Sequence, residues 1–143
     1  MLKTKKDTLE KSAKIYIAGH TGLVGNAIIL KLKAEGFTNV VIKTHQELDL
    51  MQQVEVRDFL KEEKPPYVLL TAARVGGIQA NISYPAQFIY ENLAIQTNVI
   101  HSSYQYGVKK LLFFGAACVY PRECPQPMKE EHLLSGLLEP RMP

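Results

Sequence analysis

The sequence lacks the features of a membrane-spanning, secreted or disulfide-rich protein. No run of about 18 apolar residues occurs, so no membrane span is expected. The first residues contain no apolar stretch of the kind found in signal peptides. There is no tryptophan, and the two cysteines, Cys118 and Cys124, form neither a CxxC pair nor a set of metal ligands with nearby histidines. Free thiols in a reducing, cytoplasmic environment are therefore expected.

An excess of charge of one sign is also missing from most of the chain. The formal net charge is +3 over 143 residues, and the excess comes from lysines that precede residue 15. No basic stripe with interleaved aromatic residues follows, so nucleic acid is not an expected partner. Residues 1–13 are expected to form a polar tail. The hydrophobic share of 46% is that of one globular domain.

Three glycines near the N-terminus follow an apolar, β-branched run and precede a segment with helix-like spacing of apolar residues. In such a strand–turn–helix unit, Gly19 allows a tight turn, Gly22 lets the backbone approach a pyrophosphate, and Gly25 lets the helix pack closely on the strand. The phosphates would lie at the positive end of the helix dipole. The predicted cofactor-binding residues here are Gly19, Gly22, Leu23, Val24 and Gly25. The alternative is a glycine-rich turn that binds no ligand.

Strand-like and helix-like segments alternate along the chain. Strands are expected at residues 14–18, 39–43, 67–73 and 110–116, helices at residues 23–35, 52–63 and 85–106, and a glycine-containing loop at residues 74–78. The strands are nearly continuous apolar runs, which is typical of a sheet covered on both faces. We therefore predict a doubly wound parallel α/β sheet of the Rossmann type. The neighbourhoods of Gly19, Lys43, Ala73 and Gly115 would then meet at one crevice.

The end of the second predicted strand indicates which dinucleotide is bound. NAD-binding folds usually place an acidic residue there for the ribose 2′-hydroxyl, whereas this chain has Lys43 and His45. Basic residues would attract a 2′-phosphate, so NADP(H) is favoured over NAD. The alternative is that Lys43 is only a solvated strand end. Asp49 and Leu50, a few residues later, are expected to flank the adenine.

Several stretches together resemble the GDP-L-fucose synthases, which are extended short-chain dehydrogenase/reductases. The resemblance is carried by residues 19–25, 47–50, 72–78, 81, 84–85, 90–92 and 111–121. It implies NADPH binding, epimerisation of the nucleotide sugar GDP-4-keto-6-deoxy-mannose at two carbons, and hydride transfer to its ketone. It also implies that Ala72, Ala73 and Arg74 line the ribose side, and that Gly115 and Ala116 line the nicotinamide side.

The same resemblance makes Cys118 the cysteine that moves a proton during epimerisation, a role that a thiolate can perform. A buried small hydrophobic residue is the alternative. Ala116 stands where the family has a serine that helps to hold the substrate carbonyl. The loss of one such donor typically costs on the order of 100-fold in rate.

The Tyr-x-x-x-Lys pair of the family is expected after residue 140 and does not appear. Tyr106 and Lys110 have the same spacing, but Gly107 would break the helix between them. We therefore expect residues 14–120 to form a dinucleotide-binding domain truncated before the last strands. Residues 121–143 would begin an active-site loop region, with no substrate domain.

Two interpretations of the chain are compatible with Ala116 and with the absence of the Tyr-x-x-x-Lys pair. The chain alone is expected to be inactive as a reductase, and it would be either a non-catalytic NADP(H)-binding module or a truncated gene product. A homodimer, or association with a full-length subunit, is a possible assembly, because the last predicted strand would leave an open sheet edge.

Overall fold

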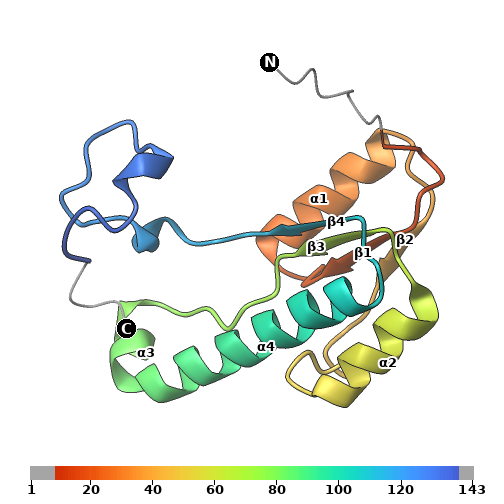
Figure 1. The fold of residues 1–143 in the computed structure, drawn as a ribbon, viewed down its shortest axis with the longest axis horizontal. Coiled ribbons are helices and arrows are strands. Elements are labelled where there is room, and N and C mark those ends of the chain that lie inside the picture. Colours follow the sequence, from red (N-terminus) through yellow and green to blue (C-terminus); the bar gives the residue numbers. More distant parts are fainter. Residues whose placement is uncertain (1–8, 139–143) are drawn as a thin grey trace.

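The computed structural model describes residues 9–138 and shows an α/β fold, as predicted (Figure 1). Residues 1–8 of the predicted tail and residues 139–143 lie outside the described part. Four parallel strands form one sheet in the order β2-β1-β3-β4. The strands are β1 (Ile15–Ala18), β2 (Val40–Ile42), β3 (Tyr67–Leu70) and β4 (Lys110–Phe113). The helices are α1 (Leu23–Ala34), α2 (Gln53–Glu63), α3 (Ile78–Ser83) and α4 (Pro85–Gln105).

Helices cover both faces of the sheet (Figure 1). Side chains of β1 alternate between the faces, as in any strand. Ile15 and Ile17 pack with Ile29 of α1 on one face. Tyr16 and Ala18 pack on the other face, against α2 and α4. This second cluster is the larger one and contains Tyr16, Ala18, Leu48, Leu50, Val56, Leu60, Val68, Leu70 and Val99. All four residues of β1 are therefore buried, which explains its continuous apolar sequence.

The strands end earlier than the sequence predicts, and the pairing of the sheet explains the difference. Thr71 still donates its backbone N–H to the carbonyl oxygen of Ala18 (2.9 Å), but β1 then turns away at Gly19. Residues 72–73 therefore have no neighbouring strand. In the same way, the backbone N–H of Phe114 donates a hydrogen bond to the carbonyl oxygen of Leu70 (3.1 Å), and the residues that follow Phe114 have no strand beside them. The sequence also missed α3, a helix of six residues, which is too short to show a clear periodicity.

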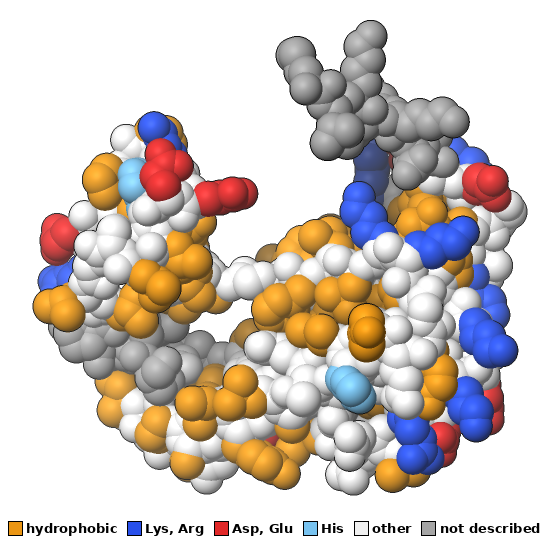
Figure 2. All heavy atoms as spheres, viewed as in Figure 1, with side chains coloured by type: hydrophobic (Ala, Val, Ile, Leu, Met, Phe, Trp, Pro, Cys, Tyr) orange, Lys and Arg blue, Asp and Glu red, His pale blue; other side chains and the backbone are white. Residues whose placement is uncertain are grey.

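Residues 114–138 leave the sheet as a long segment with two short 3₁₀ helices, η1 (Ala117–Val119) and η2 (Glu130–His132) (Figure 1). The segment folds back on itself through a hydrogen bond from Arg122 N–H to the carbonyl oxygen of Leu137 (3.0 Å). A deep hollow separates it from the sheet (Figure 2). Over residues 9–138, no helix has the length and apolar character needed to span a membrane.

Candidate functional site

A cavity of about 570 Å³ opens where β1 and β3 end. From β1 the chain crosses to β2 on one side, and from β3 it crosses to β4 on the other side. Ligands of open α/β sheets bind at such a switch point. The cavity is lined by the glycine turn at residues 19–25, by residues 43–45 and 48–51 after β2, by residues 71–75 after β3, and by Tyr16, Glu91 and Ile95.

The three glycines of the turn are needed for different reasons. Gly19 has φ +91°, and a Cβ there would lie 2.6 Å from the backbone nitrogen of Ala72. A Cβ on Gly25 would overlap the carbonyl oxygen of Gly19. Gly22 has an ordinary φ of −75°, and a Cβ there would meet only Gly19 O, at 3.4 Å. The fold therefore requires Gly19 and Gly25, whereas the bare backbone at Gly22 is not required by the protein's own packing.

Gly22 is also the N-cap residue of α1, directly before its first residue, Leu23. It offers no side chain to cap the helix, and the first turn contains no acidic residue. The first N–H groups of a helix have no intrahelical partner, and they carry the positive end of the dipole. Together with the lining of the cavity by residues 19–25, this arrangement fits a phosphate-bearing ligand.

A tight turn after β2 presents Lys43 and His45 to the cavity. The carboxylate of Glu47 accepts hydrogen bonds from the backbone N–H and the hydroxyl of Thr44, at 2.8 and 2.7 Å. These bonds lower the pKa of Glu47 below its ordinary value. The Nζ atom of Lys43 lies 3.9 Å from the same carboxylate, and His45 Nδ1 lies 3.8 Å from Asp49 Oδ1. The turn thus brings the ammonium of Lys43 to the cavity, where it forms a long salt bridge with Glu47.

The opposite wall includes Arg74, whose charge is already paired. Its Nη1 atom lies 2.9 and 3.0 Å from the two carboxylate oxygens of Glu91, and its guanidinium lies over the ring of Phe88 at 5.2 Å. Its backbone N–H donates to Asn92 Oδ1 (2.9 Å). Arg74 therefore shapes this wall and has less charge available for an anionic ligand than Lys43 has.

The structure brings twelve of the predicted site residues to this cavity and leaves three outside it. Those that line it are Gly19, Gly22, Leu23, Val24, Gly25, Lys43, His45, Asp49, Leu50, Ala72, Ala73 and Arg74. Gly115, Ala116 and Cys118 do not line it. Gly19, Lys43 and Ala73 thus lie together at the cavity, whereas Gly115 does not line it. The reason is that β4 lies beyond β3, about 5 Å farther from the switch point, and the chain then leaves the sheet.

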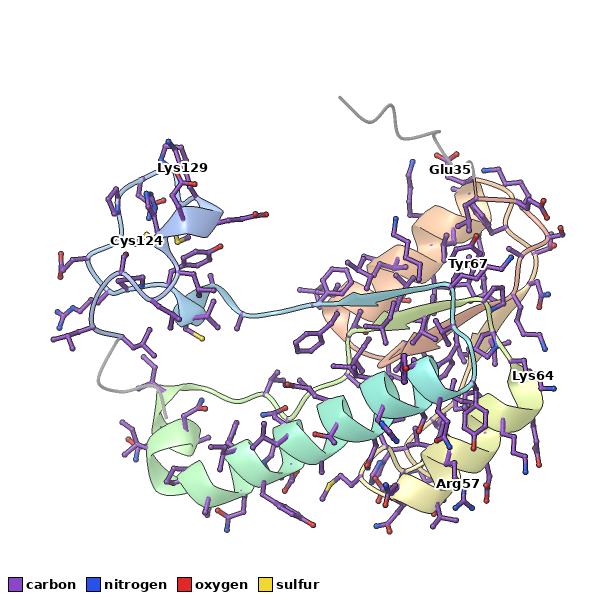
Figure 3. The ribbon with its side chains drawn as sticks, in the orientation of Figure 1. Glu35, Arg57, Lys64, Tyr67, Cys124 and Lys129 are labelled. Atoms are coloured by element: carbon purple, nitrogen blue, oxygen red, sulfur yellow. The ribbon has the colours of Figure 1, made fainter. Side chains whose placement is uncertain are left out.

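The C-terminal segment contains a contact that the sequence did not indicate. Cys124 Sγ lies 3.4 Å from His132 Nδ1, and the same nitrogen accepts the backbone N–H of Lys129 (3.2 Å). Figure 3 shows Cys124 and Lys129 in this segment, far from Tyr67 of the sheet. The sequence analysis finds no metal-ligand spacing between the cysteines and nearby histidines, and so it does not predict this contact. The contact depends on the local fold of residues 121–132.

Thr71 is a cavity residue that the sequence analysis did not single out. Its hydroxyl donates to the carbonyl oxygen of Ala18 (2.7 Å) and lies 3.2 Å from that of Gly19. The side chain therefore ties the end of β3 to the start of the glycine turn. A polar threonine within an apolar predicted strand was the available signal, but its partner is more than fifty residues away and could not be inferred.

The comparisons with known proteins agree with this geometry. The family model described as NAD dependent epimerase/dehydratase family matches residues 15–143. The chain is 62% identical to GDP-L-fucose synthase 1 of Arabidopsis thaliana over 131 residues, which are 92% of this chain and 41% of that protein. It is 48% identical to GDP-L-fucose synthase of Escherichia coli (strain K12) over 127 residues, 89% of this chain and 40% of that protein. The chain thus spans about 40% of the length of these curated relatives.

Solved structures show the same fold with a dinucleotide. The GDP-mannoheptose C4 reductase MlghC of Campylobacter jejuni, solved with NADP bound, superposes with a TM-score of 0.87 at 52% identity, over 92% of this chain and 42% of that one. A GDP-L-fucose synthetase of Naegleria fowleri bound to NADP gives a TM-score of 0.79 at 28% identity, over 92% of this chain and 39% of that one.

Proposed function

This chain belongs to the NAD dependent epimerase/dehydratase family, and we propose that it forms the NADP(H)-binding part of a reductase for GDP-linked keto sugars. The observation that carries the proposal is the bare backbone of Gly22 at the start of α1. Within residues 9–138, a Cβ at Gly22 would meet only the carbonyl oxygen of Gly19, at 3.4 Å, and helix N–H groups that have no intrahelical partner lie beside it. A pyrophosphate is the ligand that such a turn accommodates.

The preference for NADP(H) over NAD(H) rests on Lys43. Its ammonium lines the cavity at the end of β2, where the ribose of the adenosine half lies in this fold. A 2′-phosphate beside Lys43 would gain a charge-assisted hydrogen bond that a 2′-hydroxyl lacks. The solved relatives from Campylobacter jejuni and Naegleria fowleri both hold NADP, which supports the same choice.

For the substrate, we propose GDP-4-keto-6-deoxy-mannose, with the bound NADPH supplying hydride to its ketone. Identity of 62% to a GDP-L-fucose synthase supports this assignment. Cys118 would be the residue that exchanges a proton with the sugar. It is half-buried in η1, on the segment that follows β4, and lies outside the cavity that would hold the cofactor.

A second candidate function is a module that binds NADP(H) without performing chemistry. The observation in its favour is Ala116, a methyl group where the family has a hydrogen-bonding serine. In addition, neither Ala116 nor Cys118 lines the cavity. The cofactor-binding residues would then be retained, while the groups that act on the sugar would not be assembled by this chain.

Two measurements on the purified chain separate these functions. Calorimetric titration should show one NADPH bound per chain, with NADH weaker by about tenfold. Oxidation of NADPH should then be followed by absorbance in the presence of GDP-4-keto-6-deoxy-mannose. Binding without oxidation supports the module, binding with oxidation supports the reductase, and a folded chain that binds neither dinucleotide contradicts both.

A further inference from the structure

Helix α4 lies beside the cavity and carries a buried asparagine that holds one of the cavity's walls. The Nδ2 atom of Asn98 donates hydrogen bonds to the carbonyl oxygens of Leu50 and Met51, both at 3.0 Å. Leu50 and Met51 line the cavity, whereas Asn98 does not, and only 9% of its surface is exposed. A single amide group therefore satisfies two carbonyl groups in a segment that belongs to no strand.

A second asparagine of α4 holds the opposite wall. The Oδ1 atom of Asn92 accepts the backbone N–H of Arg74 (2.9 Å), and its Nδ2 atom donates to the carbonyl oxygen of Arg74 (3.1 Å). Ile95, which lies between the two asparagines in sequence, lines the cavity itself. Residues three apart lie on one side of a helix, so α4 presents Asn92, Ile95 and Asn98 toward the site.

The two walls differ in the part of the ligand that they would contact. Residues 48–51 follow the turn that carries Lys43 and His45, so they lie at the adenosine end of the cavity. We propose that Asn98 is a positioning residue that fixes this wall for the adenosine half of NADP(H). The proposal rests on the proposed function of dinucleotide binding. Asn92, which holds residue 74, is the matched comparison at the other wall.

The physical role is preorganisation. Residues 44–52 have no neighbouring strand, and without Asn98 the carbonyl groups of Leu50 and Met51 would lose a buried donor. A buried carbonyl group without a hydrogen-bond donor costs free energy. The loss of Asn98 would therefore destabilise the present conformation of this segment. The segment would then sample other conformations, and a ligand would have to order it on binding, which lowers affinity.

The test uses Asn98→Ala, Asn98→Asp and Asn92→Ala in the 143-residue chain, with 2′,5′-ADP as a probe of the adenosine half. Asn98→Asp keeps the shape but points carboxylate oxygens at two carbonyl oxygens. Amide hydrogen exchange of the ligand-free chain reports on the walls directly. We expect Asn98→Ala to accelerate exchange at residues 48–52 by about tenfold and to lower the affinity for 2′,5′-ADP about tenfold. Asn98→Asp should have a larger effect on both quantities. Asn92→Ala should accelerate exchange at residues 73–76 and change the affinity for 2′,5′-ADP by no more than about twofold.

Several results would overturn the proposal. One is unchanged exchange at residues 48–52 in Asn98→Ala, and another is acceleration of equal size in all segments, which would indicate general destabilisation. Equal loss of 2′,5′-ADP affinity in Asn92→Ala would also overturn it. A failure of the wild-type chain to bind 2′,5′-ADP would refute the proposed function as well. In that case the exchange data alone still show whether Asn98 holds the wall, so the two failures can be told apart.

Discussion

Gly22 and Gly25 occupy the same turn, yet a side chain would fit at Gly22 and would not fit at Gly25. Gly25 faces the backbone of Gly19, and an added Cβ would overlap it. Gly22 has space for a Cβ and an ordinary backbone conformation. A requirement for glycine at position 22 therefore has to come from a ligand, which makes the pair a means of separating folding from binding.

Alanine substitutions at these glycines should affect stability differently. Gly25→Ala should lower the free energy of unfolding by about 3 kcal/mol, because backbone atoms must move to relieve the overlap. Gly22→Ala should leave it unchanged or raise it by up to about 0.5 kcal/mol, since alanine restricts the unfolded chain. Urea unfolding of both variants measures the difference. Equal destabilisation by the two substitutions would contradict the assignment of their roles.

Lys43 should determine the choice between the two dinucleotides. Lys43→Ala removes the ammonium that would face the 2′-phosphate, so NADPH affinity should fall about tenfold while NADH affinity stays within about twofold. Lys33→Ala, at an exposed position in the last turn of α1, is the matched control and should change neither. Calorimetric titrations of the two dinucleotides provide the measurement. A parallel loss for NADPH and NADH in Lys43→Ala would argue against contact with the 2′-phosphate.

At this scale the sequence predicted the residues whose roles are local. The glycine spacing and the basic strand end are read within a few residues, and the structure places them at the cavity. The partners of Arg74 and Thr71 could not be predicted. Arg74 pairs with Glu91, seventeen residues away, and Thr71 bonds to Ala18, fifty-three residues away. Only the packing of α4 and β1 against β3 brings these groups together.

Among the elements, the turn after β2 should contribute a pH-dependent part of the stability. The hydrogen bonds from Thr44 lower the pKa of Glu47 in the folded chain below its ordinary value of 4.5. The contribution is therefore complete above the unfolded pKa, and it is lost as the pH falls through the folded pKa. Wild type should lose more stability than Glu47→Gln between about pH 6 and about pH 3.

Urea midpoints across this range measure the effect, and Thr44→Val, which removes one of the two donors to Glu47, should give an intermediate loss. The pKa of Glu35 is also lowered, by its hydrogen bond with Lys31. Glu35 is present in every variant, so its contribution to the pH dependence of stability is the same in all of them. The same pH dependence in wild type and in Glu47→Gln would show that the turn contributes nothing to it.

The elements themselves were largely predictable, because each depends on a local pattern. All four strands and the three long helices occur where periodicity places them. The strand ends were not predictable, since β3 and β4 stop where their neighbours turn away. The left-handed residues Gly36 and Gly107 (φ +81° and +73°) follow α1 and α4, as expected for glycines at helix ends.

On the scale of the whole molecule, the outer strand leaves apolar surface open. Leu112 and Phe114, on β4 and directly after it, are 47% and 42% exposed. Only β3 pairs with β4 among the described strands. Figure 2 shows hydrophobic side chains gathered in the central part of the molecule, on the face that borders the hollow. Exposed edge strands with apolar side chains favour pairing with another chain.

We therefore expect the 143-residue chain to self-associate, and Phe114→Lys to shift it toward monomer. A charge at this position would have to be buried in a contact that covers the apolar side chains around β4. Val54→Lys, at an exposed position of α2, is the control and should leave the association unchanged. Sedimentation velocity over a range of protein concentrations measures the self-association. A wild-type chain that stays monomeric at every concentration would refute the expectation.

The position of the C-terminal segment, residues 114–138, could not be predicted from the sequence. Residues 114–138 have little periodicity, and after β4 this segment extends away from the sheet (Figure 1). The predicted roles of Gly115, Ala116 and Cys118 depend on this segment, and they remain predictions. The roles predicted for the glycine turn depend instead on β1 and α1, which are fixed by the core.

Binding of NADPH by the wild-type chain and by Gly22→Ala, titrated side by side in the calorimeter, tests the central claim most directly. The claim predicts saturable binding of one NADPH per wild-type chain. It also predicts that Gly22→Ala lowers the NADPH affinity at least about tenfold without lowering the free energy of unfolding. Equal NADPH affinity in the two folded proteins would contradict it, because the pyrophosphate would then not rest on the backbone at Gly22.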